Sequence, residues 1–549
     1  MNDNRRPRIG MLWGDFPWTS APRKLGKLWS MGRVARDITY ALRQTAEVVP
    51  YLPPEDKTEE REEMKAFLHR IDLLWADVYP SSALALTLRK ELGLGIPAVL
   101  FAGGAMPKGA EAMLFPWRQL LHAKDGILFT CRADQQIWKR LVQWSHLQEW
   151  VIPLSVDQTV FYPRTADERQ ETRKQLSIPP DAPVLLYVGR LNVQKNLHTL
   201  LHLFAAVKEQ VQDAYLCIVG EEDDIAFGEF RVRNTGYVEW LRGISDSLRI
   251  SESVRWVGPR FGEELAKMYS AADVAVNMGF YHRENFGLSQ AEAASCGLPV
   301  VCTAWGGFKD VVRHGETGYF VDAVLTKNGI RADWASGAKV LVNLLRQRSL
   351  REEMGRRSTQ FAEIHFSLEA LANNLRGVAC EVLPGITSWG EEGAYAPSEF
   401  AERYEANKRA SGWYGAGELQ GMKWQPPMFQ GKDYELYETH MAPYSTRLAE
   451  EWGMESVTSE HIPYFAASVT LDSDRLLILN EDPIWPHRRF LTQQEWDIVR
   501  HIDGIRTLEE IVRQAGTEFS SCVHVVWSLY LEGFVLFLNN STFAPEILA

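Results

Sequence analysis

The sequence predicts an α/β protein with two doubly wound lobes and a small α+β domain at its end. Short apolar runs such as Pro183–Val188 alternate with amphipathic helical segments such as the one that begins near Leu197, a pattern typical of parallel sheets covered by helices. From Ser468 onward, a hairpin pattern followed by three short helical segments replaces this alternation. A chain of 549 residues is long enough for several such units.

The first half of the chain contains a series of short apolar runs that we interpret as the parallel strands of one lobe. A helix is expected from Gly32 through Leu42, after the first of these runs. The expected strands are Arg8–Trp13, Ile71–Trp75, Ile96–Phe101, Gly126–Cys131 and Trp150–Pro153.

The most informative stretch of the second half is HRENFGLSQAEAASCGLPVV, which contains Glu284 and Glu292. We expect a helix that begins near Asn285 and stops at Gly297, before the apolar run Val300–Cys302. Such a helix points free backbone N–H groups at a ligand in front of it, which favours a phosphate. Glu292 would lie about two turns beyond Glu284, so the pair can address the two ends of one extended ligand. For either acid alone a solvated helix residue is the better reading, but the whole string favours the ligand site.

Two cations that follow the strand Pro183–Val188 favour the same kind of ligand. Gly189 and Arg190 come directly after this strand, and Lys195 follows in the same loop. Arg190 can bind two phosphate oxygens in a fork, and Lys195 can neutralise the charge on a leaving group. Single cations in loops are more often merely solvated, but the order of these motifs favours a site for a nucleotide sugar.

Four strings in this region carry a resemblance to a known family. They are VGRLNVQKN, VRWVGPRFGEELAKMYSAADV, ENFGLSQAEAASCGLPVV and GGFKDVVRHGETGYFV. In these strings the chain resembles the donor half of the retaining GT-B glycosyltransferases, the group that includes enzymes similar to sucrose and glycogen synthase. The resemblance is close from about Ala182 to Asp322 and looser over the first half, and it is more specific for the class than for the substrate.

The resemblance implies a role for each charged position. Arg190 and Lys195, beside Gly189, would hold the donor diphosphate. Glu284 would contact the transferred sugar, and Glu292 would bind the ribose. Arg190, Lys195 and Glu284 are therefore the candidate catalytic residues.

The resemblance also implies contacts through the backbone. Amides of Asn285, Phe286 and Gly287 would contact the sugar and phosphate, and groups near Gly258 would read the base. Gly32 stands where the first lobe would closely approach the donor. Many relatives carry a histidine after the strand that ends at Phe101. This chain has none there, and its nearest histidine, His122, is expected on the following helix as a structural residue.

The implied reaction retains the configuration at the anomeric carbon. In the front-face route, the leaving phosphate takes the acceptor proton, so no separate base is required. We expect no cofactor and no metal, because side chains meet the diphosphate charge. The donor substrate is expected to be a UDP- or GDP-sugar, while the identity of the base stays open.

Changes of pattern predict four segments. Residues 1–162 would form the first lobe together with a return helix in 367–385, and residues 163–366 the donor lobe. An aromatic-rich connecting segment, 386–461, would pack over the lobes, with a carbohydrate-stacking platform as the alternative. Its main aromatic residues are Trp389, Trp413, Trp424, Trp452, Tyr395, Tyr414, Tyr434 and Tyr444.

Residues 462–549 have a small winged-helix pattern. The strings LTQQEWDIVRHIDGIRTLEEIV and VWSLYLEGFVLF resemble PqqD-like domains, or peptide recognition elements, which bind a precursor-peptide leader as an added strand. A DNA-binding winged helix is the structural rival, but many acids and few basic residues after Thr492 would repel phosphates. The expected elements are a hairpin over Ser468–Asn480, helices over Phe490–Ile502, Leu508–Ala515 and Cys522–Leu531, and a strand over Phe534–Leu538.

Composition limits the partners. A net charge of −12 argues against nucleic acid, and no apolar stretch is long enough to cross a bilayer. The start MNDNRRPR leads into a strand rather than a secretory apolar core, so we expect a cytoplasmic location. Six cysteines without paired metal spacing are expected to be reduced.

Three functional readings remain open. The first is a glycosyltransferase that acts on a ribosomally made precursor peptide recruited by the last domain. The second is a similar enzyme that acts on a small molecule or glycan, with the last domain used for assembly. The third is an inactive, peptide-binding scaffold, which the intact phosphate and sugar positions disfavour.

Overall fold

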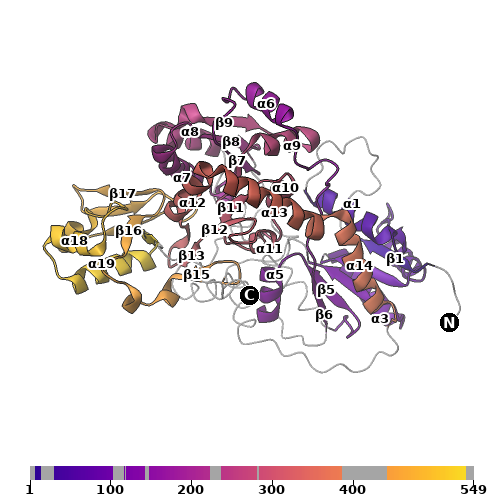
Figure 1. The fold of residues 1–549 in the computed structure, drawn as a ribbon. Helices are drawn as coiled ribbons and strands as arrows, with labels where there is room; N and C mark the ends of the chain where they lie inside the picture. The colour runs from indigo at the N-terminus through magenta and orange to yellow at the C-terminus, as the bar shows by residue number, and fades with distance from the viewer. Residues whose placement is uncertain are drawn as a thin grey trace. The chain divides into compact units, whose positions relative to one another are not determined.

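The structure is a computed structural model that describes residues 6–13, 30–78, 80–102, 117, 119–141, 147–222, 236–280, 284–385 and 442–538. The chain divides into two compact units. The first comprises Met1–Gln158 and Ala362–Met422, and the second comprises Thr159–Phe361 and Lys423–Ala549. Each unit contains a six-stranded parallel sheet with its own helices (Figure 1).

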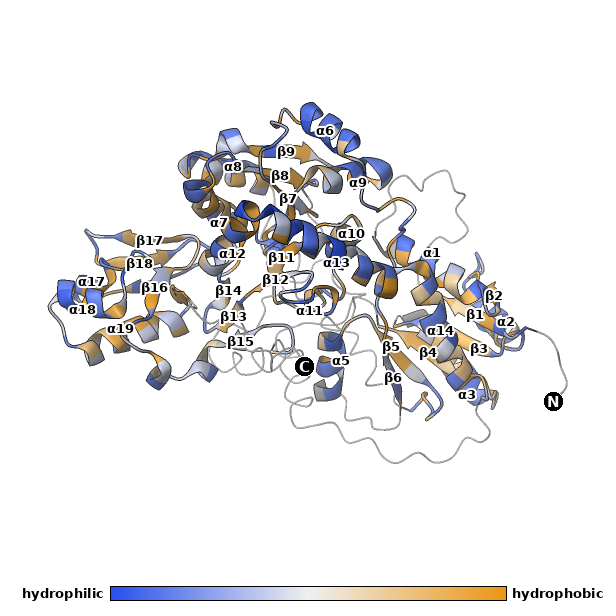
Figure 2. Cartoon of the chain, viewed as in Figure 1, coloured by the Kyte–Doolittle hydropathy of each residue, from blue (hydrophilic) through white to orange (hydrophobic). Residues whose placement is uncertain are grey.

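The sheet of the first unit has the strand order β2-β1-β3-β4-β5-β6. Its central strands read as continuous apolar runs because helices cover both faces of a parallel sheet. In Figure 2 these strands are mostly orange, and the surrounding helices carry blue residues. The strands are β1 (Arg8–Leu12), β2 (Glu47–Pro50), β3 (Leu73–Asp77), β4 (Ala98–Phe101), β5 (Gly126–Phe129) and β6 (Gln148–Val151).

The helices of the first unit include one from much later in the chain. Helix α14 (Leu368–Val382) packs against α1 (Ser30–Arg43), and Ser367 caps it by accepting a hydrogen bond from the N–H of Ala370. Gly32 lies in the first turn of α1. The other helices among the described residues of this unit are α2 (Glu60–Leu68), α3 (Pro80–Glu91) and α5 (Arg132–Leu141).

A buried ion pair fixes the centre of the first unit. Arg89 on α3 and Asp125 before β5 are both fully buried, and two parallel hydrogen bonds of 2.7 Å join them. Asp125 also accepts the backbone N–H groups of Ala98 and His122, each at 2.7 Å. The expectation that His122 lies on a helix is wrong. The residue belongs to the turn that Asp125 closes before β5.

The sheet of the second unit has the order β12-β11-β10-β7-β8-β9. From β7 the chain builds outward through β8 and β9, and it then returns to pair β10 on the other side of β7. In open α/β sheets, ligands bind at the carboxyl ends of the strands where the order reverses. The strands are β7 (Val184–Val188), β8 (Tyr215–Val219), β9 (Val254–Gly258), β10 (Val274–Asn277), β11 (Val300–Thr303) and β12 (Gly318–Val321). We call this sheet and its helices the second lobe.

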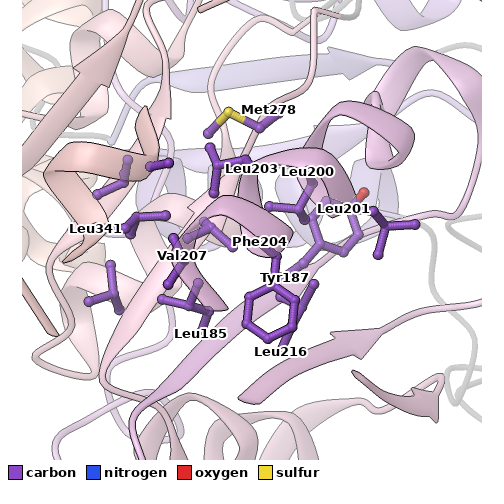
Figure 3. Packing of buried hydrophobic residues seen from close by; sticks show 14 of the residues in the cluster. Leu185, Tyr187, Leu200, Leu201, Leu203, Phe204, Val207, Leu216, Met278 and Leu341 are labelled. Atoms are coloured by element: carbon purple, nitrogen blue, oxygen red, sulfur yellow. The ribbon is translucent and has the colours of Figure 1, made fainter. Parts of the chain in front are cut away.

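Helices enclose the sheet of the second lobe. Leu200 and Phe204 of α7 (Leu197–Gln210) pack with Leu185 of β7 and Leu341 of α12 (Trp334–Arg346) in a buried core (Figure 3). Burying each such side chain stabilises the fold by about 1.5–3 kcal/mol. Among the described residues, the lobe also contains α6 (Ala166–Gln175), α8 (Tyr237–Ser247), α9 (Gly262–Ala271), α10 (Leu288–Ser295), α11 (Phe308–Val311) and most of α13 (Arg348–Phe366).

Residues 462–538, which we call the C-terminal domain, contain two small sheets and three helices. Strands β17, β18 and β19 form one antiparallel sheet, while β16 pairs with β20. The elements are β16 (Ile462–Phe465), β17 (Val469–Asp472), β18 (Leu477–Asn480), β19 (His487–Phe490), α17 (Gln493–Val499), α18 (Leu508–Ala515), α19 (Phe519–Leu531) and β20 (Val535–Leu538).

The expectation that a helix begins at Phe490 is wrong. Phe490 ends β19, where it pairs with Leu477 of β18. The helix begins only after Thr492, because Thr492 and Glu495 form a capping box.

The C-terminal domain packs on the second lobe through a hairpin. Strands β13 (Ala323–Thr326) and β14 (Gly329–Ala332) pair with each other, and β15 (Arg447–Leu448) adds to β13. The Tyr464 hydroxyl donates to Asp333 Oδ1 at 2.5 Å, and Arg331 Nε donates to the Gly533 carbonyl at 2.9 Å. These contacts explain why the C-terminal domain shares a compact unit with the second lobe.

The connecting segment is described only in part. Trp389, Trp413, Trp424, Tyr395, Tyr414 and Tyr434 lie outside the described residues. Tyr444 is fully buried, with its ring centroid 5.6 Å from that of Trp305. Trp452 packs against Trp527, with 5.8 Å between ring centroids, in the core of the C-terminal domain. Across the described residues, no helix combines the length and apolar character needed to cross a bilayer.

The Arg89–Asp125 pair gives a stability test. We expect Asp125→Ala to lower the free energy of unfolding by about 3–5 kcal/mol, because it leaves the Arg89 charge buried without its partner. Glu91→Ala, which removes an exposed ion pair with Arg61 in the same unit, should cost about 0–1 kcal/mol. Urea unfolding with hydrogen exchange at β4 and β5 measures both, and equal losses would contradict the structural role of Asp125.

Candidate functional site

Glycines bring the loops after three neighbouring strands close together. The N–H of Gly189, after β7, donates to the Val219 carbonyl at 3.0 Å, and the N–H of Gly220, after β8, donates to Gly258 at 3.1 Å. A Cβ on Gly220 would lie 1.9 Å from the Gly189 carbonyl oxygen. Gly258 has a φ of +78°, which glycine adopts without strain. The backbone after β7, β8 and β9 therefore gathers at one edge of the sheet.

Arg190 and Glu284 both act on the buried phenol of Tyr187. The Tyr187 hydroxyl donates to the Arg190 carbonyl at 2.9 Å. Burial raises the pKa of Tyr187 well above its ordinary value. Tyr237 and the Glu284 carboxylate raise this pKa further, and the Arg190 guanidinium lowers it. The structure thus brings the two charged groups to the same part of the lobe.

Lys195 and Glu284 form an ion pair at the point where the strand order reverses. Lys195 ends a short 3-10 turn (Val193–Lys195) after β7, and Glu284 lies in the loop after β10. The Lys195 Nζ is hydrogen-bonded to the Glu284 carboxylate, with only 12% and 13% of the two side chains exposed. A largely buried pair of this kind requires close partners, because each charge has lost most of its water.

Backbone contacts hold the Lys195 segment against the chain after β10. Asn196 adopts a left-handed conformation with φ of +55°, and its Nδ2 donates to the Met278 carbonyl at 2.9 Å. The N–H of Phe280 donates to the Gln194 carbonyl at 3.3 Å. The position of Lys195 is therefore set by residues that follow β10.

Paired glycines support the backbone of Glu284. The N–H of Gly307 donates to the Glu284 carbonyl at 2.7 Å. A Cβ on Gly307 would lie 2.4 Å from the backbone nitrogen of Phe286, and one on Gly306 would lie 2.4 Å from the Glu284 oxygen. Only glycine fits at these two positions while the Glu284 loop keeps its place.

Helix α10 begins later than the sequence indicates. Gly287 has a φ of +94°, so it cannot belong to a right-handed turn, and the helix starts at Leu288 rather than near Asn285. Glu292 consequently lies about one turn into the helix. Its buried carboxylate accepts a hydrogen bond of 2.9 Å from the Tyr269 hydroxyl. The two glutamates therefore have different partners.

The expected site residues fall into two groups. Gly32 belongs to the first unit. The second unit contains all the others, which are Gly189, Arg190, Lys195, Gly258, Glu284, Asn285, Phe286, Gly287 and Glu292. Sequence reasoning missed Tyr187 and Tyr269, whose hydroxyls contact the site. A tyrosine in a buried strand is a usable signal, because its hydroxyl needs a polar partner.

Asn192 is a further residue of this region that sequence reasoning missed. Its side chain is fully buried, and neither amide atom has a hydrogen-bond partner among the described residues. Such a group is costly unless water or a ligand satisfies it. Among the described residues, no group of three or more His, Cys, Asp or Glu side chains could hold a metal ion.

Residues 168–360 match the family model described as Glycosyl transferases group 1. A D-inositol 3-phosphate glycosyltransferase from Actinosynnema mirum is 36% identical over 186 residues, 34% of this chain and 41% of that protein. One from Corynebacterium jeikeium is 31% identical over 237 residues, 43% of this chain and 52% of that protein. The chain thus spans about half or less of the length of these curated relatives.

Solved structures share the architecture. Sucrose-phosphate synthase from Thermosynechococcus elongatus aligns with a TM-score of 0.50 at 20% identity, over 69% of this chain and 100% of that one. HepE of Anabaena, solved in complex with UDP, aligns with a TM-score of 0.52 at 16% identity, over 68% and 99%. The two Rossmann-like lobes are those of the GT-B fold, which confirms the expected fold class.

The paired glycines give a test of the loop geometry. We expect Gly307→Ala to cost about 1–3 kcal/mol and to speed hydrogen exchange at residues 284–288, because the added methyl group displaces the Phe286 backbone. Gly243→Ala, in α8 where a Cβ meets nothing within 4 Å, should be neutral or stabilising. Unchanged exchange at 284–288 in Gly307→Ala would contradict this support role.

Proposed function

We propose that the protein is a retaining glycosyltransferase that moves a sugar from a nucleoside-diphosphate sugar to an acceptor. The observation that carries this proposal is the Lys195–Glu284 ion pair at the strand-order reversal of the second lobe. Arg190 lies in the same loop as Lys195. The match of residues 168–360 to the glycosyltransferase family model supports the same class of reaction.

The side chains divide the work between the two ends of the donor. Lys195 breaks its ion pair with Glu284 and neutralises the charge of the diphosphate. Arg190 binds phosphate oxygens in a fork. Glu284 then accepts hydrogen bonds from sugar hydroxyls. Backbone amides of Asn285, Phe286 and Gly287 contact the sugar and phosphate, while Glu292 exchanges the Tyr269 hydroxyl for the ribose.

The transfer step needs charge stabilisation more than proton transfer by the protein. The bond between the anomeric carbon and the phosphate oxygen breaks, and the acceptor oxygen bonds to the same face of that carbon. The acceptor proton passes to the leaving phosphate. Fixed positive groups around the diphosphate lower the barrier because they require no reorganisation when charge develops. Neither a metal nor another cofactor takes part in this scheme.

The donor is a UDP- or GDP-sugar in this proposal. HepE of Anabaena, which shares the fold, was solved in complex with UDP. Backbone groups near Gly258 contact the base.

The acceptor is a ribosomally made precursor peptide recruited by the C-terminal domain. Strand β19 lies at an edge of the three-stranded sheet, and an exposed strand edge can accept a peptide as a further strand. Arg489 of β19 bonds to Glu495 of α17 and to Glu532 after α19, so the strand has a fixed position. Phe490 is 66% exposed and offers an apolar contact.

A phosphorylated small molecule is the second candidate acceptor. The relatives from Actinosynnema mirum and Corynebacterium jeikeium are named D-inositol 3-phosphate glycosyltransferases. In this version the C-terminal domain serves assembly.

Substitutions at the ion pair test the chemistry. We expect Lys195→Ala and Glu284→Ala each to lower donor turnover by about 10²-fold or more, because each removes a group that stabilises the transition state. Lys267→Ala, which breaks an exposed ion pair with Glu264 in the same lobe, is the matched control and should leave turnover unchanged. Turnover of UDP- and GDP-sugars is measured with and without EDTA, beside a melting curve for each variant.

Two results would end this assignment. Near-normal turnover in both Lys195→Ala and Glu284→Ala excludes the proposed roles, and loss of wild-type activity in EDTA excludes the metal-independent scheme. If the protein consumes no donor and its melting temperature does not shift with nucleoside diphosphates, the inactive, peptide-binding scaffold is the reading that remains.

Peptide titration of the full chain tests the acceptor. We expect a cognate leader peptide to bind and Phe490→Ala to weaken binding by about tenfold, because the side chain loses its apolar contact. Arg475→Ala, at an exposed hairpin residue of the same domain, is the control. Transfer to inositol phosphate without peptide binding would favour the second candidate.

A further inference from the structure

The loop between β18 and β19 buries side chains that a hairpin loop would usually expose. Asp482 is 4% exposed and Trp485 is 8% exposed. Connecting segments normally run over the surface. This loop instead projects from the C-terminal domain into the second lobe.

Asp482 binds the start of helix α7. Its Oδ1 accepts the N–H groups of Ile484 and Trp485 at 2.8 and 2.9 Å, which fixes the loop. Its Oδ2 lies 3.5 Å from His198 Nε2 and 3.8 Å from Arg331 Nη1. Burial alone would raise the pKa of Asp482, but the hydrogen bond with His198 and the charge of Arg331 outweigh burial and lower it. The carboxylate therefore stays ionised.

His198 transmits this contact to the Lys195 segment. It lies in the first turn of α7, directly after the turn that ends at Lys195, and it is 1% exposed. Because an ionised carboxylate only accepts, Nε2 carries the proton toward Asp482, while Nδ1 lies 3.4 Å from the Tyr237 hydroxyl. The side chain is held on both sides.

Trp485 reaches the other side of the Lys195 segment. Its ring centroid lies 5.2 Å from that of Phe280. The Phe280 N–H bonds to Gln194, the residue before Lys195. The Trp485 ring also fills the space above Gly329, where a Cβ would lie 2.3 Å from it. The indole therefore packs between the β13–β14 hairpin and the chain that follows β10.

We propose that Asp482 and Trp485 are positioning residues for glycosyl transfer. They hold Lys195 from two sides, Asp482 through His198 and Trp485 through Phe280. This inference rests on the proposed function of the second lobe and assigns the C-terminal domain a second task besides acceptor recruitment. Small displacements of reacting groups cost catalysis heavily, so the loop contributes to turnover even when no peptide is bound.

The test uses the full chain and donor hydrolysis without an acceptor. We expect Trp485→Ala and Asp482→Asn each to lower kcat by about tenfold or more while KM for the donor and the melting shift with UDP change by less than about threefold. Trp485→Phe, which keeps a ring against Phe280, should restore kcat to within about threefold of wild type. Ile505→Ala, at a 77% exposed position of the same domain, is the matched control.

Hydrogen exchange separates this inference from the proposed function. We expect faster exchange at residues 193–200, 278–280 and 284–288 in Trp485→Ala and Asp482→Asn, and unchanged exchange in β1–β6. If the wild type consumes no donor, the proposed function fails, while exchange still reports whether the loop holds the Lys195 segment. If Trp485→Ala does not fold, Asp482→Asn and Trp485→Phe carry the comparison. Normal kcat and normal exchange in folded Asp482→Asn would overturn the inference, as would equal losses in Ile505→Ala.

Discussion

The ion pair between Lys195 and Glu284 is the constraint on which the second lobe is organised. Two mostly buried opposite charges must stay together, because either one alone would lose its water without compensation. The loops after β7 and β10 carry one charge each, and they meet where the strand order reverses. Glycines are required after the strands and at Gly306 and Gly307, because several backbone segments come too close there to leave room for a Cβ. In the proposed function, a bound diphosphate would offer Lys195 a stronger anionic partner, and the resting pair would hold both groups in place before the donor binds.

The C-terminal domain is part of the same constraint. It shares a core with the β13–β14 hairpin. In its loop, Asp482 contacts His198 and Trp485 contacts Phe280, the residues that lie on either side of the Lys195 turn. A domain that only tethered an acceptor would not need the Asp482 carboxylate to be buried against the second lobe. Strand β19 follows directly after this loop, so a peptide added at that edge would lie one loop away from the residues that hold Lys195. The proposed peptide edge and the proposed positioning loop are therefore adjacent in the chain.

Local signals were enough for much of the fold, and they failed where distant residues decide. The helix Leu508–Ala515 was predicted with its true bounds, because Thr507 and Glu510 form a capping box and Gly516 ends the helix in a left-handed conformation. The helix expected from Phe490 was wrong, since pairing with Leu477 makes that residue part of a strand. The start of α10 moved from Asn285 to Leu288, because the Gly306–Gly307 turn packs against the preceding loop and Gly287 takes a positive φ.

By itself, the sequence determined the alternation of strands and helices and the short segments in which charged candidates occur, because periodicity and capping depend on near neighbours. The GT-B fold class followed from the resemblance of four short strings to that family. Only the tertiary structure decided which side chains meet. Lys195 pairs with Glu284, Tyr269 bonds to Glu292, and Asp482 contacts His198, although each pair is separated by many residues in the chain. Such pairings depend on strand order and on how fully each group is removed from water, and neither quantity is written in a local pattern.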